Sequence, residues 1–87
     1  MKKKFTILDI DDISTEEEIN KLNEEVKEFI VAMENEDLEN MIEEFYDVIQ
    51  VMINLAYRYD VINDLEEGLN KHLRKINKRN WNIIKYI

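Results

Sequence analysis

The chain has 87 residues, which allows one small domain with a limited core, and it contains no proline, no cysteine and one glycine. The absence of cysteine excludes disulfides and thiolate zinc sites, and the near-absence of helix breakers predicts an all-α chain with short connections. The net charge of −8 argues against stable nucleic-acid binding, which needs a basic surface. No stretch approaches the ~20 apolar residues of a membrane span, so we expect a cytoplasmic protein without membrane contact.

The charges are segregated along the chain. All 20 acidic residues lie between Asp9 and Glu67, whereas six cations and no acid follow Asn70. The cations are Lys71, Arg74, Lys75, Lys78, Arg79 and Lys85. Cations near a helix C-terminus complement its dipole, which is one explanation. A site that holds both a metal and phosphates is the other, and the charge pattern leaves both open.

Residues 1–13 carry no helix signal, so we predict an extended N-terminal segment. Ser14 and Glu17 form a capping-box pattern that predicts a first helix from about Thr15 to Met33. Apolar residues recur at helical spacing along it and predict its inward face: Ile19, Leu22, Val26, Phe29, Ile30 and Met33.

A second helix should begin after a cap at Asn35 or Asp37 and reach about Tyr59. Its apolar stripe widens almost all the way round beyond residue 48, and a helix that is apolar on most faces is buried on most faces. The stripe consists of Leu38, Met41, Ile42, Phe45, Val48, Ile49, Met52 and Ala56. Two other short helices cannot cover this surface, so we predict a homo-oligomer, either a dimer or a dimer of dimers.

A third helix should begin at Asp60 or Asn63 and run to about Arg79. Its predicted inward residues are Leu65, Leu69, Leu73 and Ile76. Residues 80–87 form an aromatic and apolar tail that we expect to pack on the bundle or on a partner subunit. The sequence therefore predicts a single domain over residues 1–87, a small antiparallel bundle of about three helices completed by oligomerisation.

Two pairs of acidic residues have the spacing i, i+3 that places each pair on one face of a helix: Glu25 with Glu28, and Glu44 with Asp47. The pairs are mirror images about position 36. A tight turn at residues 35–37 would therefore bring the four carboxylates together across an antiparallel hairpin. Such a cluster repels itself unless it holds a cation, and an oxygen-rich site without cysteine suits magnesium.

Other acidic residues are more numerous than these four, and most charge runs are solvated helix faces. The residues that we expect to be solvated are Glu16, Glu17, Glu18, Glu34, Glu36, Glu39, Glu66 and Glu67. The mirrored pairs differ from them because both pairs lie beside the apolar stripes of their helices. This position favours a metal site over a chance arrangement.

The pattern Glu24-Glu25-x-x-Glu28, fifteen residues, Glu44-x-x-Asp47 resembles the signature of the all-α nucleotide pyrophosphohydrolases. This superfamily includes MazG-type enzymes, dimeric dUTPases and phosphoribosyl-ATP pyrophosphohydrolases. The segments EEVKEFIVAM and EEFYDVIQVMINLAYRYDV resemble its two motif helices, and Asn70-Lys71 matches a downstream pair of MazG-type members. The resemblance covers about residues 19–80. The chain departs from it in two ways. Members usually have a small residue at the position of Tyr46, and many carry a further helix upstream, whereas residues 1–13 of this chain carry no helix signal.

The resemblance implies magnesium-dependent hydrolysis of an NTP or dNTP to a monophosphate and pyrophosphate, which would cleanse the nucleotide pool. Magnesium, or manganese as a substitute, would be held by the four mirrored carboxylates, and Glu24 or one of these four would accept the proton of the attacking water. Lys71, Lys75 and Arg79 would neutralise the leaving pyrophosphate, with Lys71 the strongest candidate. Substrate-orienting amides are expected at Asn54 and Asn70.

A second hypothesis belongs to another class of protein. Small acidic helical chains also serve as antitoxins, inhibitors or nucleic-acid mimics that occupy basic partner surfaces. This hypothesis predicts no magnesium dependence and gives no reason for the mirrored carboxylates. The sequence does not identify the base or sugar of a substrate.

Overall fold

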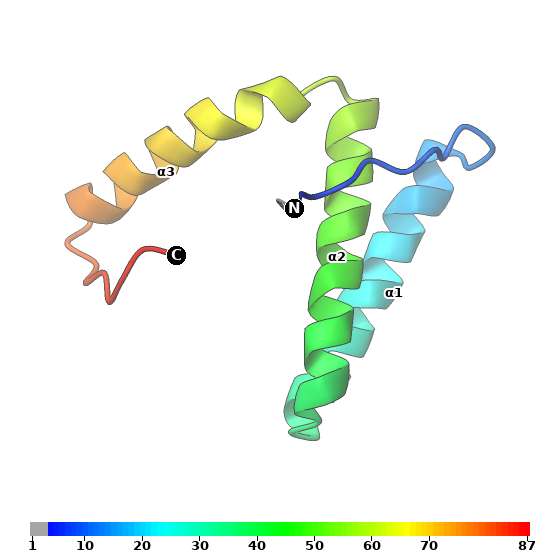
Figure 1. The fold of residues 1–87 in the computed structure, drawn as a ribbon, viewed down its shortest axis with the longest axis horizontal. Coiled ribbons are helices and arrows are strands. Elements are labelled where there is room, and N and C mark those ends of the chain that lie inside the picture. Colours follow the sequence, from blue (N-terminus) through cyan, green and yellow to red (C-terminus); the bar gives the residue numbers. More distant parts are fainter. Residues whose placement is uncertain (1–3) are drawn as a thin grey trace.

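The computed structural model describes residues 4–87, which fold into α1 (Thr15–Glu34), α2 (Leu38–Arg58), the short 3₁₀ helix η1 (Ile62–Asp64) and α3 (Leu65–Lys78). No strand occurs in this described part of the chain, so the all-α prediction is confirmed. Helices α1 and α2 form an antiparallel hairpin, and α3 extends from its open end like an arm (Figure 1). The first three residues of the predicted N-terminal segment lie outside the described residues, and the remainder up to Ile10 is extended without regular structure.

The ends of the hairpin helices follow from local hydrogen bonding. The Ser14 side chain accepts a hydrogen bond of 3.0 Å from the backbone N–H of Glu17, as the capping-box pattern predicts. Asp37, rather than Asn35, caps α2, and its carboxylate accepts a 3.3 Å hydrogen bond from the first turn. Glu36 between them adopts a left-handed backbone conformation with φ of 53°, which reverses the chain within three residues.

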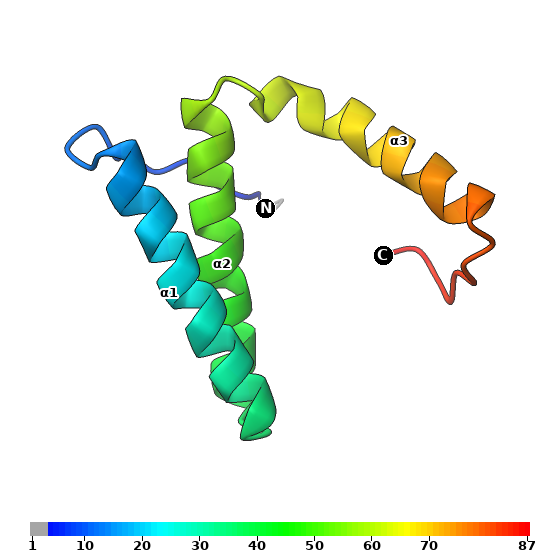
Figure 2. The same ribbon diagram turned by 180° about the vertical axis from the view of Figure 1, so that it is seen from behind.

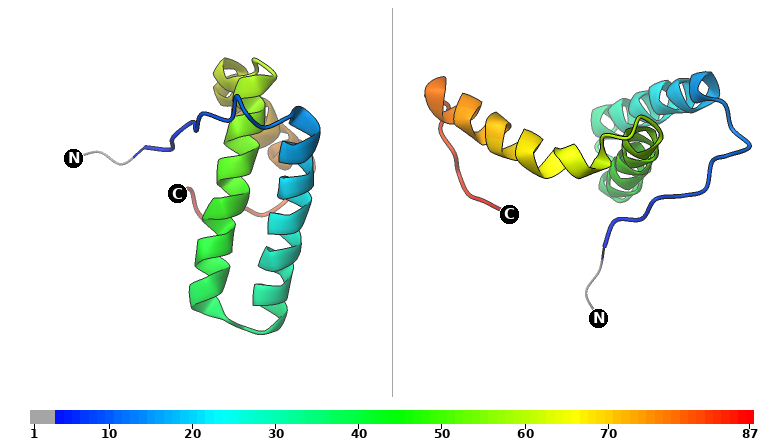
Figure 3. Two further views of the ribbon diagram at one scale, coloured as in Figure 1. Left: turned by 90° about the vertical axis from the view of Figure 1, so that its right-hand side faces the viewer. Right: turned by 90° about the horizontal axis from the view of Figure 1, so that it is seen from above.

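Helix α3 differs from its prediction in its start and its packing. It begins at Leu65, after η1, rather than at Asp60 or Asn63, and its end at Lys78 lies within one residue of the predicted end. Among the described elements, its backbone contacts η1 but neither α1 nor α2, and Figures 2 and 3 show it projecting away from the hairpin. Leu65 and Leu69 are consequently exposed, so the prediction that they face inward is wrong for a single chain.

Few side chains are fully buried between α1 and α2. Ala32 and Val51 are the buried apolar residues, and Glu18 and Asn54 are the buried polar ones. The predicted apolar stripes instead leave large side chains exposed along the hairpin, including Ile19, Ile30, Met33, Leu38, Ile42, Phe45 and Met52. We call these seven residues the apolar face. An exposed apolar surface of this kind marks an interaction site in most proteins.

The C-terminal tail does not cover this surface in one chain. Residues 81–87 have no regular structure and are exposed, with Ile84 97% accessible to solvent. The Arg79 guanidinium lies 5.3 Å from the centre of the Trp81 ring and anchors the start of the tail by a cation–π contact. In a single chain the tail therefore does not pack on the bundle, and the alternative that it packs on a partner subunit stays a prediction. Within residues 4–87, we find no helix with the length and hydropathy to cross a membrane.

Candidate metal centre

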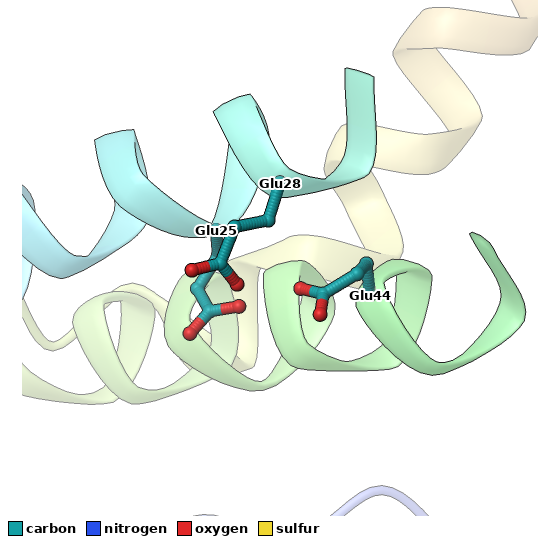
Figure 4. Close-up of side chains that lie close together, drawn as sticks. All are labelled: Glu25, Glu28 and Glu44. Atoms are coloured by element: carbon teal, nitrogen blue, oxygen red, sulfur yellow. The ribbon is translucent and has the colours of Figure 1, made fainter. Parts of the chain in front are cut away.

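Three carboxylates from the two hairpin helices meet near the middle of the hairpin. Glu25 and Glu28 lie one turn apart on α1, and Glu44 faces them from α2. One carboxylate oxygen from each residue lies within 4.8 Å of the others, and Figure 4 shows all three side chains pointing into the space between the helices. We call them the acidic trio. Glu28 and Glu44 meet because their positions are mirrored about the turn at Glu36, and Glu25 joins them because it lies one helical turn from Glu28.

Asp47 lies at the edge of this group. It is exposed and is not part of the acidic trio, yet its charge contributes to raising the pKa of Glu25. The structure therefore brings three of the four predicted metal ligands together and leaves the fourth beside them.

The electrostatics of the trio fit a site that binds a cation. Burial raises the pKa of Glu25, and a hydrogen bond shared with the Glu25 carboxyl, followed by burial, raises the pKa of Glu44 to about 7. One buried oxygen of each, Oε2, has no hydrogen-bond partner in the described part of the chain. Buried polar atoms without partners are rare, and a divalent ion with oxygen ligands satisfies both oxygens and removes the repulsion. The residues present therefore fit a hard cation such as magnesium.

The raised pKa of Glu44 predicts that the metal-free protein becomes less stable as the pH rises. Folded protein keeps Glu44 protonated up to a pH of about 7, whereas the unfolded chain releases the proton near the ordinary value of 4.5. The folded state binds more protons across this window, so the free energy of unfolding falls between these two values and then levels off. In thermal melts with a chelator, the melting temperature of Glu44→Gln relative to wild type should increase as the pH rises from 4.5 to about 7. An advantage that is independent of pH would contradict this.

The remaining predicted site residues lie outside the trio. Glu24 is exposed on α1 beside Glu25, whereas Asn54 is buried on α2, two turns beyond Asp47. The predicted phosphate-binding residues are all exposed on the α3 arm, away from the hairpin of their own chain: Asn70, Lys71, Lys75 and Arg79.

One predicted surface residue is in fact buried. Glu18, expected to be solvated within a run of three glutamates, is only 1% exposed, and its Oε1 accepts a 3.3 Å hydrogen bond from Nδ2 of Asn54. The same mirror symmetry about position 36 relates Glu18 and Asn54, so the sequence did contain a signal for their contact. The signal was missed because Glu18 belongs to a run of three glutamates that was expected to be solvated as a whole.

Comparison with protein families agrees with this geometry. The family model of the MazG nucleotide pyrophosphohydrolase domain matches residues 13–84, which include both carboxylate-bearing helices and the α3 arm. The chain belongs to the MazG family. No curated protein and no solved structure matches it. The resemblance in the sequence is thereby confirmed, and the acidic trio lies within the MazG domain.

Proposed function

We propose that this MazG-family protein is a magnesium-dependent nucleoside triphosphate pyrophosphohydrolase, with an NTP or dNTP as substrate. The observation that carries the proposal is the acidic trio, three carboxylate oxygens within 4.8 Å of one another inside a MazG domain. A triphosphate cannot approach such a site without a cation because both carry negative charge. The family match favours this function over that of a non-enzymatic acidic binding protein.

Glu25, Glu28, Glu44 and Asp47 are the residues that would hold Mg²⁺, with Mn²⁺ as a substitute. Bound there, the ion would neutralise phosphate charge and polarise the phosphorus that is attacked. The two unpartnered Oε2 atoms of Glu25 and Glu44 support this assignment because carboxylate oxygens are the ligands that these ions prefer.

Glu24 is the proposed general base. Water adds to the α-phosphorus, the bond from that phosphorus to the α–β bridging oxygen breaks, and pyrophosphate leaves. The proton of the water would pass to the carboxylate of Glu24, an exposed residue that precedes Glu25 in the sequence. Asn54 and Asn70 were assigned to substrate orientation from the sequence, and of these Asn70 retains an exposed amide on the arm.

The cations of α3 would reach the phosphates from a second copy of the chain. Lys71, Lys75 and Arg79 stand on an arm that leaves its own hairpin, whose apolar face is also uncovered. A homodimer, or a dimer of dimers, would cover that face and bring the basic arm of one subunit to the acidic trio of another. The attraction between the acidic hairpin and the basic arm favours this arrangement.

Pyrophosphate release from a panel of NTPs and dNTPs tests the function. Wild type with Mg²⁺ should turn over at least one nucleotide, whereas excess chelator or the Glu44→Ala substitution should abolish release. Glu43→Ala is the matched control, because it removes the same charge from an exposed neighbouring position. The proposal would be contradicted if wild type turned over no nucleotide of the panel, or if the Glu44→Ala variant turned over nucleotide as fast as wild type.

A further inference from the structure

Three polar side chains on α2 bind the backbone of the N-terminal segment, which crosses α2 in Figure 1. Gln50, Asn54 and Arg58 are spaced by four residues, a rise of about 6 Å on a helix, which nearly equals the rise of about 6.6 Å for two extended residues. They therefore meet alternate residues of 6–10, which we call the strap. The contacts are Gln50 Nε2 to the Thr6 carbonyl (2.7 Å), the Leu8 N–H to Asn54 Oδ1 (3.1 Å) and Arg58 Nη2 to the Ile10 carbonyl (2.6 Å).

Asn54 is the centre of this network. Its Oδ1 accepts hydrogen bonds of 3.1 Å from the Leu8 N–H and from Gln50 Nε2, and its Nδ2 donates to Glu18 Oε1 on α1. Three of its four hydrogen-bonding positions are thus occupied within the protein, and the residue is 3% exposed. Arg58 adds a second link to α1 through the Thr15 hydroxyl at 3.3 Å. The network ties the strap and both helices together at the open end of the hairpin.

The acidic trio needs such a tie. Its carboxylates come from both α1 and α2, so the distances between them depend on how firmly the two helices are held together. At the closed end the turn joins the helices covalently, but at the open end they are held by side chains alone. Glu18 and Asn54 lie level across the hairpin, seven residues or about 10.5 Å from Glu25 and Asp47 respectively.

We infer that Asn54 is a positioning residue, which clamps the open end of the hairpin through Glu18 and the strap and so sets the spacing of the acidic trio. The inference deepens the proposed function and rests on it for its catalytic meaning. It also replaces the substrate contact assigned to Asn54 from the sequence. A residue that contacts substrate would alter nucleotide affinity, whereas a clamp alters the helix spacing and the metal affinity before any nucleotide binds.

The test compares Asn54→Ala with Asp37→Ala in the full chain. Asp37→Ala is the matched control, because it removes the cap of α2 but leaves the clamp intact. The two substitutions lie equally far along α2 from the carboxylates: Asp37 is seven residues from Glu44, and Asn54 is seven residues from Asp47. Because the chain has no cysteine, Lys27→Cys and Glu43→Cys at two exposed positions accept spin labels that report the distance between α1 and α2. Calorimetry with Mg²⁺ alone measures metal affinity without nucleotide.

Asn54→Ala should broaden the distance distribution and weaken Mg²⁺ binding about tenfold, as loss of supporting contacts around a metal site does, while Asp37→Ala changes neither. Glu18→Gln should retain wild-type behaviour because it keeps an oxygen that accepts from Asn54. If Asn54→Ala does not fold, Glu18→Ala breaks the same link from α1 and should show the same two effects.

Other outcomes separate this inference from the proposed function. Unchanged distances and metal affinity in Asn54→Ala, or a raised KM for nucleotide with unchanged metal affinity, would overturn the clamp. The wild-type protein could instead bind no Mg²⁺ while the distance distribution broadens in Asn54→Ala and not in Asp37→Ala. That result would support the clamp and contradict the magnesium proposal.

Discussion

Glu44→Gln should abolish catalysis and at the same time stabilise the metal-free protein. The glutamine keeps the size of the side chain but cannot ionise, so the hydrogen bond with Glu25 and the burial that raise the pKa of Glu44 no longer oppose a negative charge at this position. Pyrophosphate release should fall about 100-fold or more, because a ligand to the ion is lost. The melting temperature in chelator at about pH 7.5 should rise, since folding no longer brings a third carboxylate into the cluster.

The response to Mg²⁺ separates the two effects of Glu44→Gln. For wild type, an ion at about ten times its Kd adds about 1.4 kcal/mol to the free energy of unfolding, which raises the melting temperature of a domain this size by about 5–10 °C. The variant should show little of this rise at the same concentration. A variant that is less stable than wild type without metal, or that keeps the full rise with metal, would contradict a metal site at Glu44.

Ile42→Glu should dissociate the proposed homo-oligomer into single chains. Ile42 is 58% exposed in one chain and lies within the apolar face, so a glutamate at this position can remain in solvent in the folded hairpin. In a symmetric dimer the substitution is present twice, and loss of two buried isoleucines costs about 3–6 kcal/mol of association free energy. Light scattering with size-exclusion chromatography should show a mass near 10.6 kDa, with activity reduced because the basic arm no longer reaches a partner's acidic trio.

Asn20→Glu is the matched control for this experiment. It adds the same negative charge at an exposed polar position of α1, outside the apolar face, so it should leave both mass and activity unchanged. Circular dichroism of both variants should show wild-type helix content. A monomeric wild type with full activity would exclude a contribution from a second subunit, and an Ile42→Glu variant that keeps the wild-type mass would place the interface elsewhere.

Local signals in the sequence predicted the hairpin well because they act over a few residues. Ser14 begins α1 and Asp37 begins α2 through hydrogen bonds within one turn, and the boundaries at Glu34 and Arg58 lie within one residue of those predicted. Helix α3 was harder to delimit. The chain leaves α2 through Asp60, whose φ of 59° is left-handed, and no sequence signal distinguishes this turn from the start of a helix.

The sequence by itself determined the all-α class, the hairpin, the membership of the MazG family and the proximity of Glu28 and Glu44 across the turn. The hairpin and this proximity follow from short-range helix signals and from a mirror symmetry that a tight turn converts into contact. Only the tertiary structure decided that α3 stands away from the hairpin and that Glu18 and Asn54 are buried together. Helical periodicity identifies an apolar face but not the surface that covers it, and the burial of one glutamate among three depends on which of them meets an amide across the hairpin.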